Sequence, residues 1–141
     1  MYAAWARARG MRFAQLETPD GGSEPRYLLA IAGFAAYTLL QPEEGLHVLE
    51  EEDEPGGRVI RRPTVRVRVL AQPTEPARDG ATGLVRQARE RLALKPATTT
   101  IVVRRYREGS SPLVRDTARG WRTRRVDRVL AGDFDLISAR E

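Results

Sequence analysis

The clearest pattern of hydrophobic and polar positions along this chain lies near its middle. Val65, Val67 and Val69 alternate with Arg66 and Arg68. Side chains that alternate with a period of two indicate a β-strand, here apolar on one face and basic on the other. We expect this strand to run to about residue 70.

Shorter stretches predict further strands. Arg12–Glu17 and Tyr27–Ala32 have β-forming residues, and the turn-forming cluster Pro19–Ser23 lies between them. Another strand is expected to begin at Leu46. The β-branched stretch Thr98–Tyr106 predicts one more strand.

Helical spacing appears near both ends of the chain. Tyr2–Arg9 places two aromatic residues on one helical face and is followed by the helix-ending Gly10. Gly33–Gly45 is expected to contain one or two helical turns. The stripe Leu84–Leu94 predicts a longer helix, with Thr82 as its candidate cap.

A last helix is expected at Val126–Leu130, between Thr123 as candidate cap and Gly132. Residues 71–83 are predicted to be a polar linker inside a single domain, 1–141. Helices on one side of a mixed sheet indicate the α+β class, as a two-layer sandwich of a mixed, mainly antiparallel sheet with helices.

Composition narrows the function classes. The chain has no cysteine and one histidine, so we expect no disulfide, no metal site and no cofactor. No apolar run reaches the length of a membrane span and no secretory signal opens the chain, so a cytoplasmic protein is expected. The net charge is +5, and Lys95 is the only lysine. A chain so rich in arginine is suited to RNA binding, but the codon usage of a GC-rich genome also gives a high arginine content.

Three stretches carry a family resemblance: residues 1–10, residues 33–47, and residues 114–123 followed by 129–135. They resemble the bacterial peptide chain release factors, most closely the type that reads UGA. The second stretch is the most specific, because Glu43 and His47 keep the family spacing without a gap. The resemblance implies the fold of the central decoding superdomain of that family.

Two departures from the family argue against its activity. The family inserts its catalytic Gly-Gly-Gln domain where this chain has only residues 71–83, and neither Gly21-Gly22 nor Gly56-Gly57 is followed by glutamine. Without that loop nothing positions water on a peptidyl ester, so we expect no enzyme activity. The codon-reading loop is replaced by an acidic run, and no histidine follows His47. Stop-codon reading is therefore not expected.

The candidate site residues form two sets of opposite charge. The acidic set is a candidate protein-binding element or a solvated loop: Glu50, Glu51, Glu52, Asp53 and Glu54. The basic residues form two separate groups, each a candidate nucleic-acid-binding site or a solvated face: Arg58, Arg61 and Arg62, and then Arg122, Arg124 and Arg125. Trp121 is expected to be buried, with base stacking as the alternative. His47, Tyr37 and Glu43 are expected to be structural.

These features predict a non-catalytic release-factor-like interaction module, a protein-binding domain of a larger assembly. Its partner would be an AAA-type ATPase or other domains of the same polypeptide. Because the resemblance begins at Met1, an excised domain is expected. The alternative is a ribosome- or RNA-associated translation factor without peptide-release activity.

Overall fold

The computed structural model describes residues 1–17, 26–54, 57–75, 77–96 and 100–135. The predicted turn at Pro19–Ser23 lies outside these residues, as does Pro55 of the hairpin that follows β3. The elements, in chain order, are α1 (Tyr2–Ala8), β1 (Arg12–Glu17), β2 (Leu28–Ala32), α2 (Ala36–Leu40), the 3₁₀ turn η1 (Gln41–Glu43), β3 (Gly45–Glu52), β4 (Val59–Arg61), β5 (Thr64–Val67), α3 (Gly80–Leu94), β6 (Val102–Arg107), β7 (Leu113–Asp116), β8 (Trp121–Thr123) and α4 (Val126–Leu130).

The strands form a mixed sheet and a separate two-stranded ribbon. In the sheet the order is β4-β3-β6-β7-β8, and β5 also pairs with β3. Among the described strands, β3 and β6 form the one parallel pair, while the other pairs of the sheet and the β1–β2 ribbon are antiparallel. The expected α+β class, a mixed and mainly antiparallel sheet with helices, is confirmed.

The parallel pair joins the two parts of the chain that flank residues 71–83. Val48 of β3 lies opposite Arg105 of β6, and Leu49 lies opposite Tyr106. A parallel pair needs a long crossover connection, and here α3 lies within that connection. The prediction that segments before and after residues 71–83 share one sheet is confirmed.

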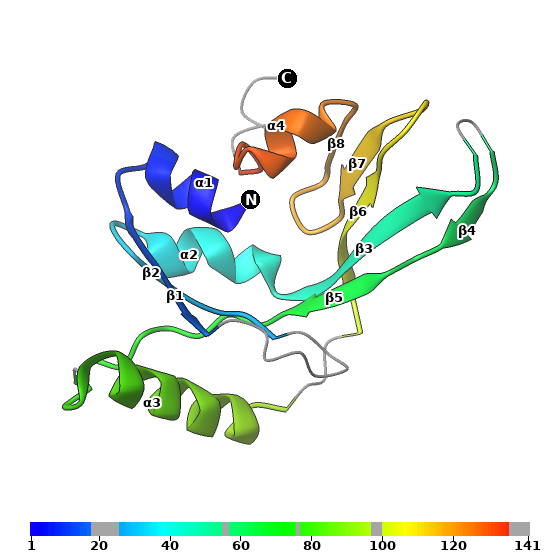
Figure 1. The fold of residues 1–141 in the computed structure, drawn as a ribbon. Coiled ribbons are helices and arrows are strands. Elements are labelled where there is room, and N and C mark those ends of the chain that lie inside the picture. Colours follow the sequence, from blue (N-terminus) through cyan, green and yellow to red (C-terminus); the bar gives the residue numbers. More distant parts are fainter. Residues whose placement is uncertain (18–25, 55–56, 76, 97–99, 136–141) are drawn as a thin grey trace.

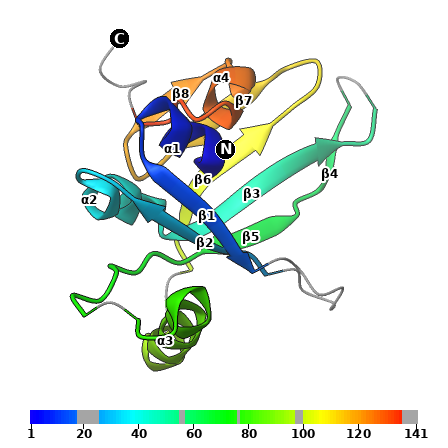
Figure 2. The same cartoon turned by 60° about the vertical axis from the view of Figure 1, so that its left-hand side comes forward.

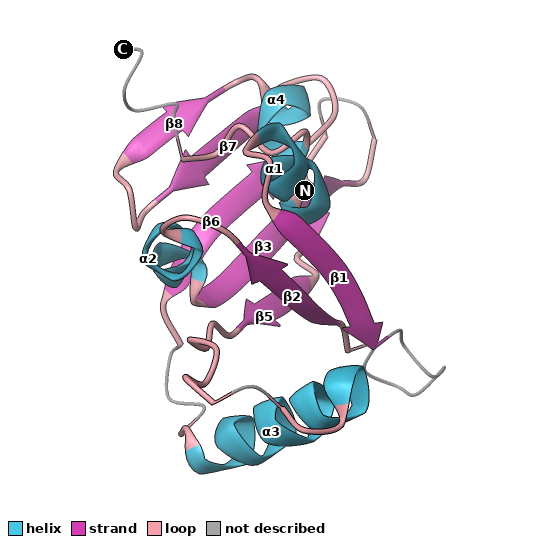
Figure 3. Ribbon diagram, turned by 90° about the vertical axis from the view of Figure 1, so that its left-hand side faces the viewer, coloured by secondary structure: helices cyan, strands magenta, loops and turns pink. Residues whose placement is uncertain are grey.

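Helices cover one face of the sheet. Figures 1 and 3 show α1, α2 and α4 on the same side of β3, β6 and β7, with α3 beyond the β5 end. Figure 2 shows the β1–β2 ribbon crossing the sheet on the helix side. The main core lies between these layers and contains Trp5, Ala6, Tyr106, Val114, Trp121, Val126, Val129 and Phe134.

Several predicted elements agree closely with the structure. Residues 12–17 form β1 with the predicted bounds, α1 ends one residue before the predicted Arg9, and α4 spans Val126–Leu130. The side chain of Thr123 accepts a hydrogen bond from the Arg125 backbone N–H at 3.2 Å, just before α4. The prediction that Thr123 caps this helix was therefore wrong, because Arg125 is the N-cap residue and no side chain caps α4.

The predicted linker was wrong at its end. Helix α3 begins at Gly80 with Asp79 as the preceding residue, so Thr82 lies inside the helix and does not cap it. Glycine lowers helix propensity, which is why Gly80 and Gly83 suggested a loop. The helix forms nonetheless, and Gly83 is buried in it.

The valine-rich strand was also partly wrong. Strand β5 ends at Val67, so Val69 and Leu70 lie beyond it. Val65 is 64% exposed, although an apolar core-facing side was expected. In the described sheet β5 pairs with β3 alone. The alternation of valine and arginine therefore predicted the strand correctly, but its valine side is not packed against the core. Residues 97–99 are not described, and the strand predicted from Thr98 is β6, which begins at Val102.

Candidate functional site

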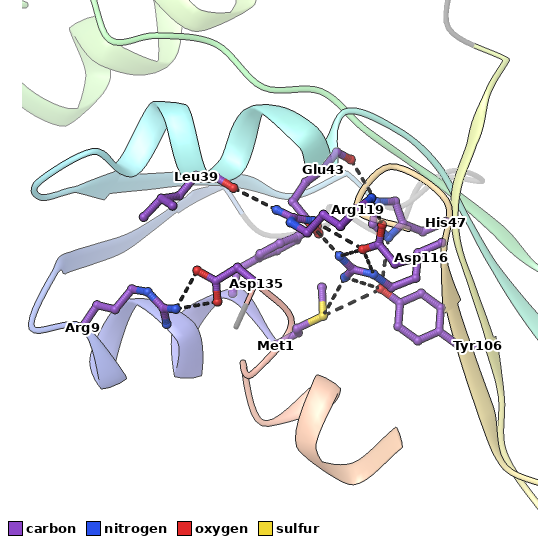
Figure 4. A network of polar contacts seen from close by, with 11 residues as sticks. Met1, Arg9, Leu39, Glu43, His47, Tyr106, Asp116, Arg119 and Asp135 are labelled. Atoms are coloured by element: carbon purple, nitrogen blue, oxygen red, sulfur yellow. Dashed lines mark hydrogen bonds and ion pairs between the residues drawn. The ribbon is translucent and has the colours of Figure 1, made fainter. Parts of the chain in front are cut away.

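A buried network of ion pairs, centred on Arg104 of β6, connects several elements of the fold. This guanidinium has no exposed surface. It donates to Asp116 Oδ2 from Nε at 2.9 Å and from Nη2 at 2.6 Å, and to Glu43 Oε1 from Nη2 at 2.6 Å. Its Nη1 donates to the Tyr106 hydroxyl at 3.1 Å. Figure 4 shows other members of this network, among them Glu43, Asp116 and Tyr106, which come together from different elements.

A second guanidinium completes the network. Arg119, in the turn between β7 and β8, contacts Glu43 Oε1 and lies 3.4 Å from Asp116 Oδ2. Its Nη2 donates to the Leu39 carbonyl at 2.9 Å. Two arginines and two carboxylates therefore balance in charge, which buried charges require.

Burial alone would raise the pKa of Glu43, but Arg104 and Arg119 outweigh it and hold that pKa below its usual value. The Tyr2 hydroxyl donates to the other oxygen of Glu43 at 2.8 Å. Burial, with Glu43 alongside, raises the pKa of Tyr2 well above its ordinary value, so the hydroxyl keeps its proton. The carboxylate of Glu43 is therefore ionised and held on both oxygens.

His47 extends the network through a directional chain of hydrogen bonds. Its Nε2 lies 2.9 Å from the Glu43 carbonyl oxygen, so this nitrogen must carry the proton. Its Nδ1 lies 3.1 Å from the Tyr106 hydroxyl, which accepts from Arg104 and can donate to Nδ1. Burial lowers the pKa of His47, consistent with a neutral ring in this chain.

The most specific part of the release-factor resemblance is thus structural. Glu43 and His47 hold the junction between η1 and β3, and Asp116 and Arg119 hold the turn after β7. Trp121 is 6% exposed, so its predicted burial is confirmed and it offers no ring to a base. Tyr37 is 44% exposed and takes no part in the network.

The acidic residues lie at the end of the β3–β4 hairpin, but they are not equivalent. Glu50 is largely buried and accepts from Arg107 Nε at 2.9 Å and Nη2 at 2.6 Å. Glu51 lies across from Arg61 in the strand register. Asp53 and Glu54 are exposed at the turn. We name Glu51, Glu52, Asp53 and Glu54 the acidic tip.

An open groove of about 300 Å³ runs beside the acidic tip. It is lined by Leu49, Glu50, the acidic tip, Glu108 and Gly109. Carboxylates from the β3–β4 and β6–β7 hairpins therefore face the same space.

The six predicted arginines fall into two groups along the chain, residues 58–62 and residues 122–125. Arg58, Arg61 and Arg62 are exposed on the hairpin that also carries the acidic tip. Arg122 lies on β8. Arg125 lies in the turn before α4, where it pairs with Asp127 at 2.8 Å. Arg124, beside it in the same turn, is exposed.

A different set of arginines is brought together by the sheet. Arg105, Arg115 and Arg122 lie directly opposite one another on β6, β7 and β8, on the face away from the helices. We name these three residues the arginine row. Sequence reasoning missed Arg105 altogether and did not select Arg115 as a site residue, because only strand register aligns them. Like charges in such positions are destabilising.

The described ranges offer neither a metal-binding cluster nor a membrane span. These contain no group of three or more histidine, cysteine, aspartate or glutamate side chains placed to hold a metal ion. No helix there is long and apolar enough to cross a membrane.

Comparison with solved structures places the fold. The chain is similar to RF2 of Thermus thermophilus, with a TM-score of 0.55 and 20% sequence identity. The match covers 99% of this chain and 59% of that chain. No protein-family model matches the sequence, and no curated protein matches it either. The predicted release-factor-like fold is therefore confirmed at the level of the fold.

Proposed function

We propose that this chain is a non-catalytic, release-factor-like interaction module that binds a basic protein partner through its acidic tip. The observation that carries the proposal is the groove lined by carboxylates from two hairpins. Figure 1 shows both hairpins reaching away from the helices, where a partner has access. A rigid scaffold that presents charged side chains at loop ends is a common arrangement for recognition.

The buried network supports this role by fixing β3 against β6. Arg104 of β6 donates a hydrogen bond to Glu43, just before β3 begins. Near the end of β3, Glu50 accepts two hydrogen bonds from Arg107 of β6. The base of the acidic tip is therefore anchored on both sides. A preorganised tip loses less entropy when a partner binds.

The non-catalytic part of the proposal rests on the chemistry of the titratable groups. His47, Glu43 and Asp116 are all engaged with one another or with arginines, and none of them faces the groove. The sequence has no Gly-Gly-Gln segment. We expect no codon-dependent release from a programmed ribosome complex, and measurable release by the purified protein would contradict this part.

Charge reversal at the turn tests the binding part. Asp53→Lys with Glu54→Lys changes two exposed side chains and leaves the Glu50–Arg107 pair intact. The matched control is Glu75→Lys with Glu90→Lys, which makes the same charge change at two other exposed positions. We expect proteins recovered from the native lysate by the wild type and by the control to be lost with the tip variant. Equal recovery by all three proteins at low salt would make the tip a solvated turn.

The second candidate is association with RNA or the ribosome, which the exposed Arg58, Arg61, Arg62 and Arg124 favour. Binding through phosphates would weaken with salt, with a slope of log affinity against log salt of about −0.7 per neutralised phosphate on a single strand. Undetectable RNA binding at low salt would remove this candidate.

A further inference from the structure

The sheet has one face that no described helix covers, as Figures 1 and 3 show. Its side chains follow from the register: Val48 and Glu50 on β3, Arg105 and Arg107 on β6, Leu113 and Arg115 on β7, and Arg122 on β8. Val48 is buried, so the exposed part of this face begins at β6. Arg115 and Arg122 are exposed. Within the described part of the chain, neither side chain forms an ion pair or a hydrogen bond.

From this arrangement we propose that the arginine row is a docking surface for an acidic segment of a partner protein. The proposal goes beyond the function above, because this face takes a partner of the opposite charge to the one that suits the acidic tip. Three guanidiniums in register repel one another. A bound carboxylate between them would relieve that repulsion.

The molecule already contains one example of the contact. Glu50 lies beside the row and is bound by both guanidinium nitrogens that face it on Arg107, at 2.9 and 2.6 Å. Arg105 approaches the other oxygen of Glu50 at 4.0 Å. Both nitrogens donate to the same oxygen, Oε2, so the guanidinium holds one carboxylate oxygen between two N–H groups. The exposed guanidiniums of Arg115 and Arg122 offer the same donors to another molecule.

A small hollow lies at the end of the row. Its volume is about 20 Å³, and it is lined by Glu50, Arg105, Arg107, Leu113 and Arg115. That is room for a single oxygen-sized atom. Three of the five lining side chains are cationic, so a carboxylate oxygen fits this position, and Leu113 offers an apolar contact to the segment that carries it.

The same face is less suited to nucleic acid. The aromatic residues of these strands, Tyr106 and Trp121, lie on the opposite, buried face, so no ring is available for base stacking. A long polyanion that crosses the row toward β3 reaches Glu50 and then the acidic tip. A short acidic segment ends before that repulsion begins.

The test uses two labelled probes, an octa-glutamate peptide and an oligothymidylate of equal charge, with binding followed by fluorescence anisotropy at low salt. We expect the peptide to bind the intact chain more tightly than the oligothymidylate does. Arg115→Glu with Arg122→Glu should weaken peptide binding about tenfold, since two exposed ion pairs are reversed. Arg12→Glu with Arg78→Glu is the matched control, because it changes the charge equally at two exposed positions on β1 and before α3, away from the row. It should weaken binding by less than about threefold.

Each other outcome overturns the proposal. No peptide binding to the wild type, or an equal loss in both variants, would mean that the row is not a site. Tighter oligothymidylate binding, lost in the row variant, would make the face a nucleic-acid surface. If the glutamate pair disturbs the fold by circular dichroism, Arg115→Gln with Arg122→Gln gives the same comparison. Asp53→Lys with Glu54→Lys should leave peptide affinity unchanged or raise it, which separates this result from a failure of the acidic tip.

Discussion

Arg104 is the residue on which the interior of this protein depends most. Its side chain has no exposed surface and neutralises two carboxylates from different elements, Glu43 and Asp116. A buried pair of this kind is not in itself strong evidence of stability, because removing charges from water is costly. Removing Arg104 should nevertheless be destabilising, since the carboxylates of Glu43 and Asp116 would remain buried with one cationic partner fewer.

The first prediction concerns this loss. Arg104→Met should lower the free energy of unfolding by about 3–5 kcal/mol, measured by urea denaturation. Arg105→Met is the control, because the neighbouring arginine points to the open face and makes only a 4.0 Å contact with Glu50. It should cost less than about 1 kcal/mol. Equal costs for the two variants would show that the network does not hold the fold.

The second prediction is a pH dependence that follows from His47. Its pKa is lowered from 6.5 by burial, and protonation would place an N–H on Nδ1 against the hydroxyl that donates to it. The unfolded chain therefore takes up a proton at higher pH than the folded chain does. The free energy of unfolding should be fully present above pH 6.5 and fall as the pH is lowered from there.

The measurement is urea denaturation between pH 7.5 and 5.5, in the wild type and in His47→Gln. Because the chain has a single histidine, the variant should show a shallower fall over this range. A second decrease is expected below pH 4.5, because the pKa of Glu43 is also lowered in the folded state. Parallel curves for the two proteins above pH 5.5 would contradict the role given to His47.

At the scale of elements, the contact between α4 and α1 depends on one backbone position. Gly132 follows α4 with φ 101°, and a Cβ there would lie 2.5 Å from the Trp5 backbone nitrogen. Gly132→Ala should therefore cost more than the ordinary penalty of about 1 kcal/mol for a left-handed alanine. Gly120→Ala is the control, since Gly120 has φ 72° and open space around it.

The readout for this third prediction is urea denaturation together with Trp fluorescence, because Trp5 is fully buried and would become solvated if α1 separated from α4. The Gly132 variant should show both lower stability and a red-shifted emission, and the Gly120 variant only a small loss of stability. Similar behaviour of the two would mean that α1 is not held by this approach.

Local signals were sufficient for some elements and not for others. Strand β1 and helix α4 have apolar spacing and turn residues of their own, so their bounds followed from the sequence. Strands β4, β7 and β8 were missed. They are only three or four residues long, and β7 turns the charged Asp116 toward the core, where alternation predicts an apolar residue. That position makes sense only once Arg104 of β6 lies opposite it.

The candidate site, too, could be predicted from the sequence only in part. The structural role of Glu43 and His47 could be expected from their spacing in the resembling stretch. The arginine row could not, because Arg105, Arg115 and Arg122 are far apart in the chain and are aligned by the pairing of three strands. The pairing of Glu50 with Arg107 depends on the parallel register between β3 and β6 and was equally hidden.

At the scale of the whole molecule, two opposite charges are displayed by one sheet. The acidic tip lies at the end of β3, which β4 and β6 flank, and the arginine row crosses β6, β7 and β8 on the open face. Both surfaces depend on β6, which lies between β3 and β7. The parallel β3–β6 pairing is therefore the contact that makes the segments on either side of residues 71–83 a single unit, as we propose.

The last prediction tests that unit by cutting the chain. Residues 1–74 alone would leave β3 without β6, and Glu43 would lose Arg104, so this fragment should not unfold cooperatively. Residues 75–141 alone would leave Arg104 with only part of its network and β6 with an unpaired edge, so this fragment should not unfold cooperatively either.

Mixed in equal amounts, the fragments should recover the circular dichroism of the intact chain. Arg104→Met in the second fragment should weaken this complementation, because the guanidinium that joins the two pieces is then missing. Cooperative thermal unfolding of either fragment by itself would show that the chain is built from two independent units and would end the proposal of a single domain.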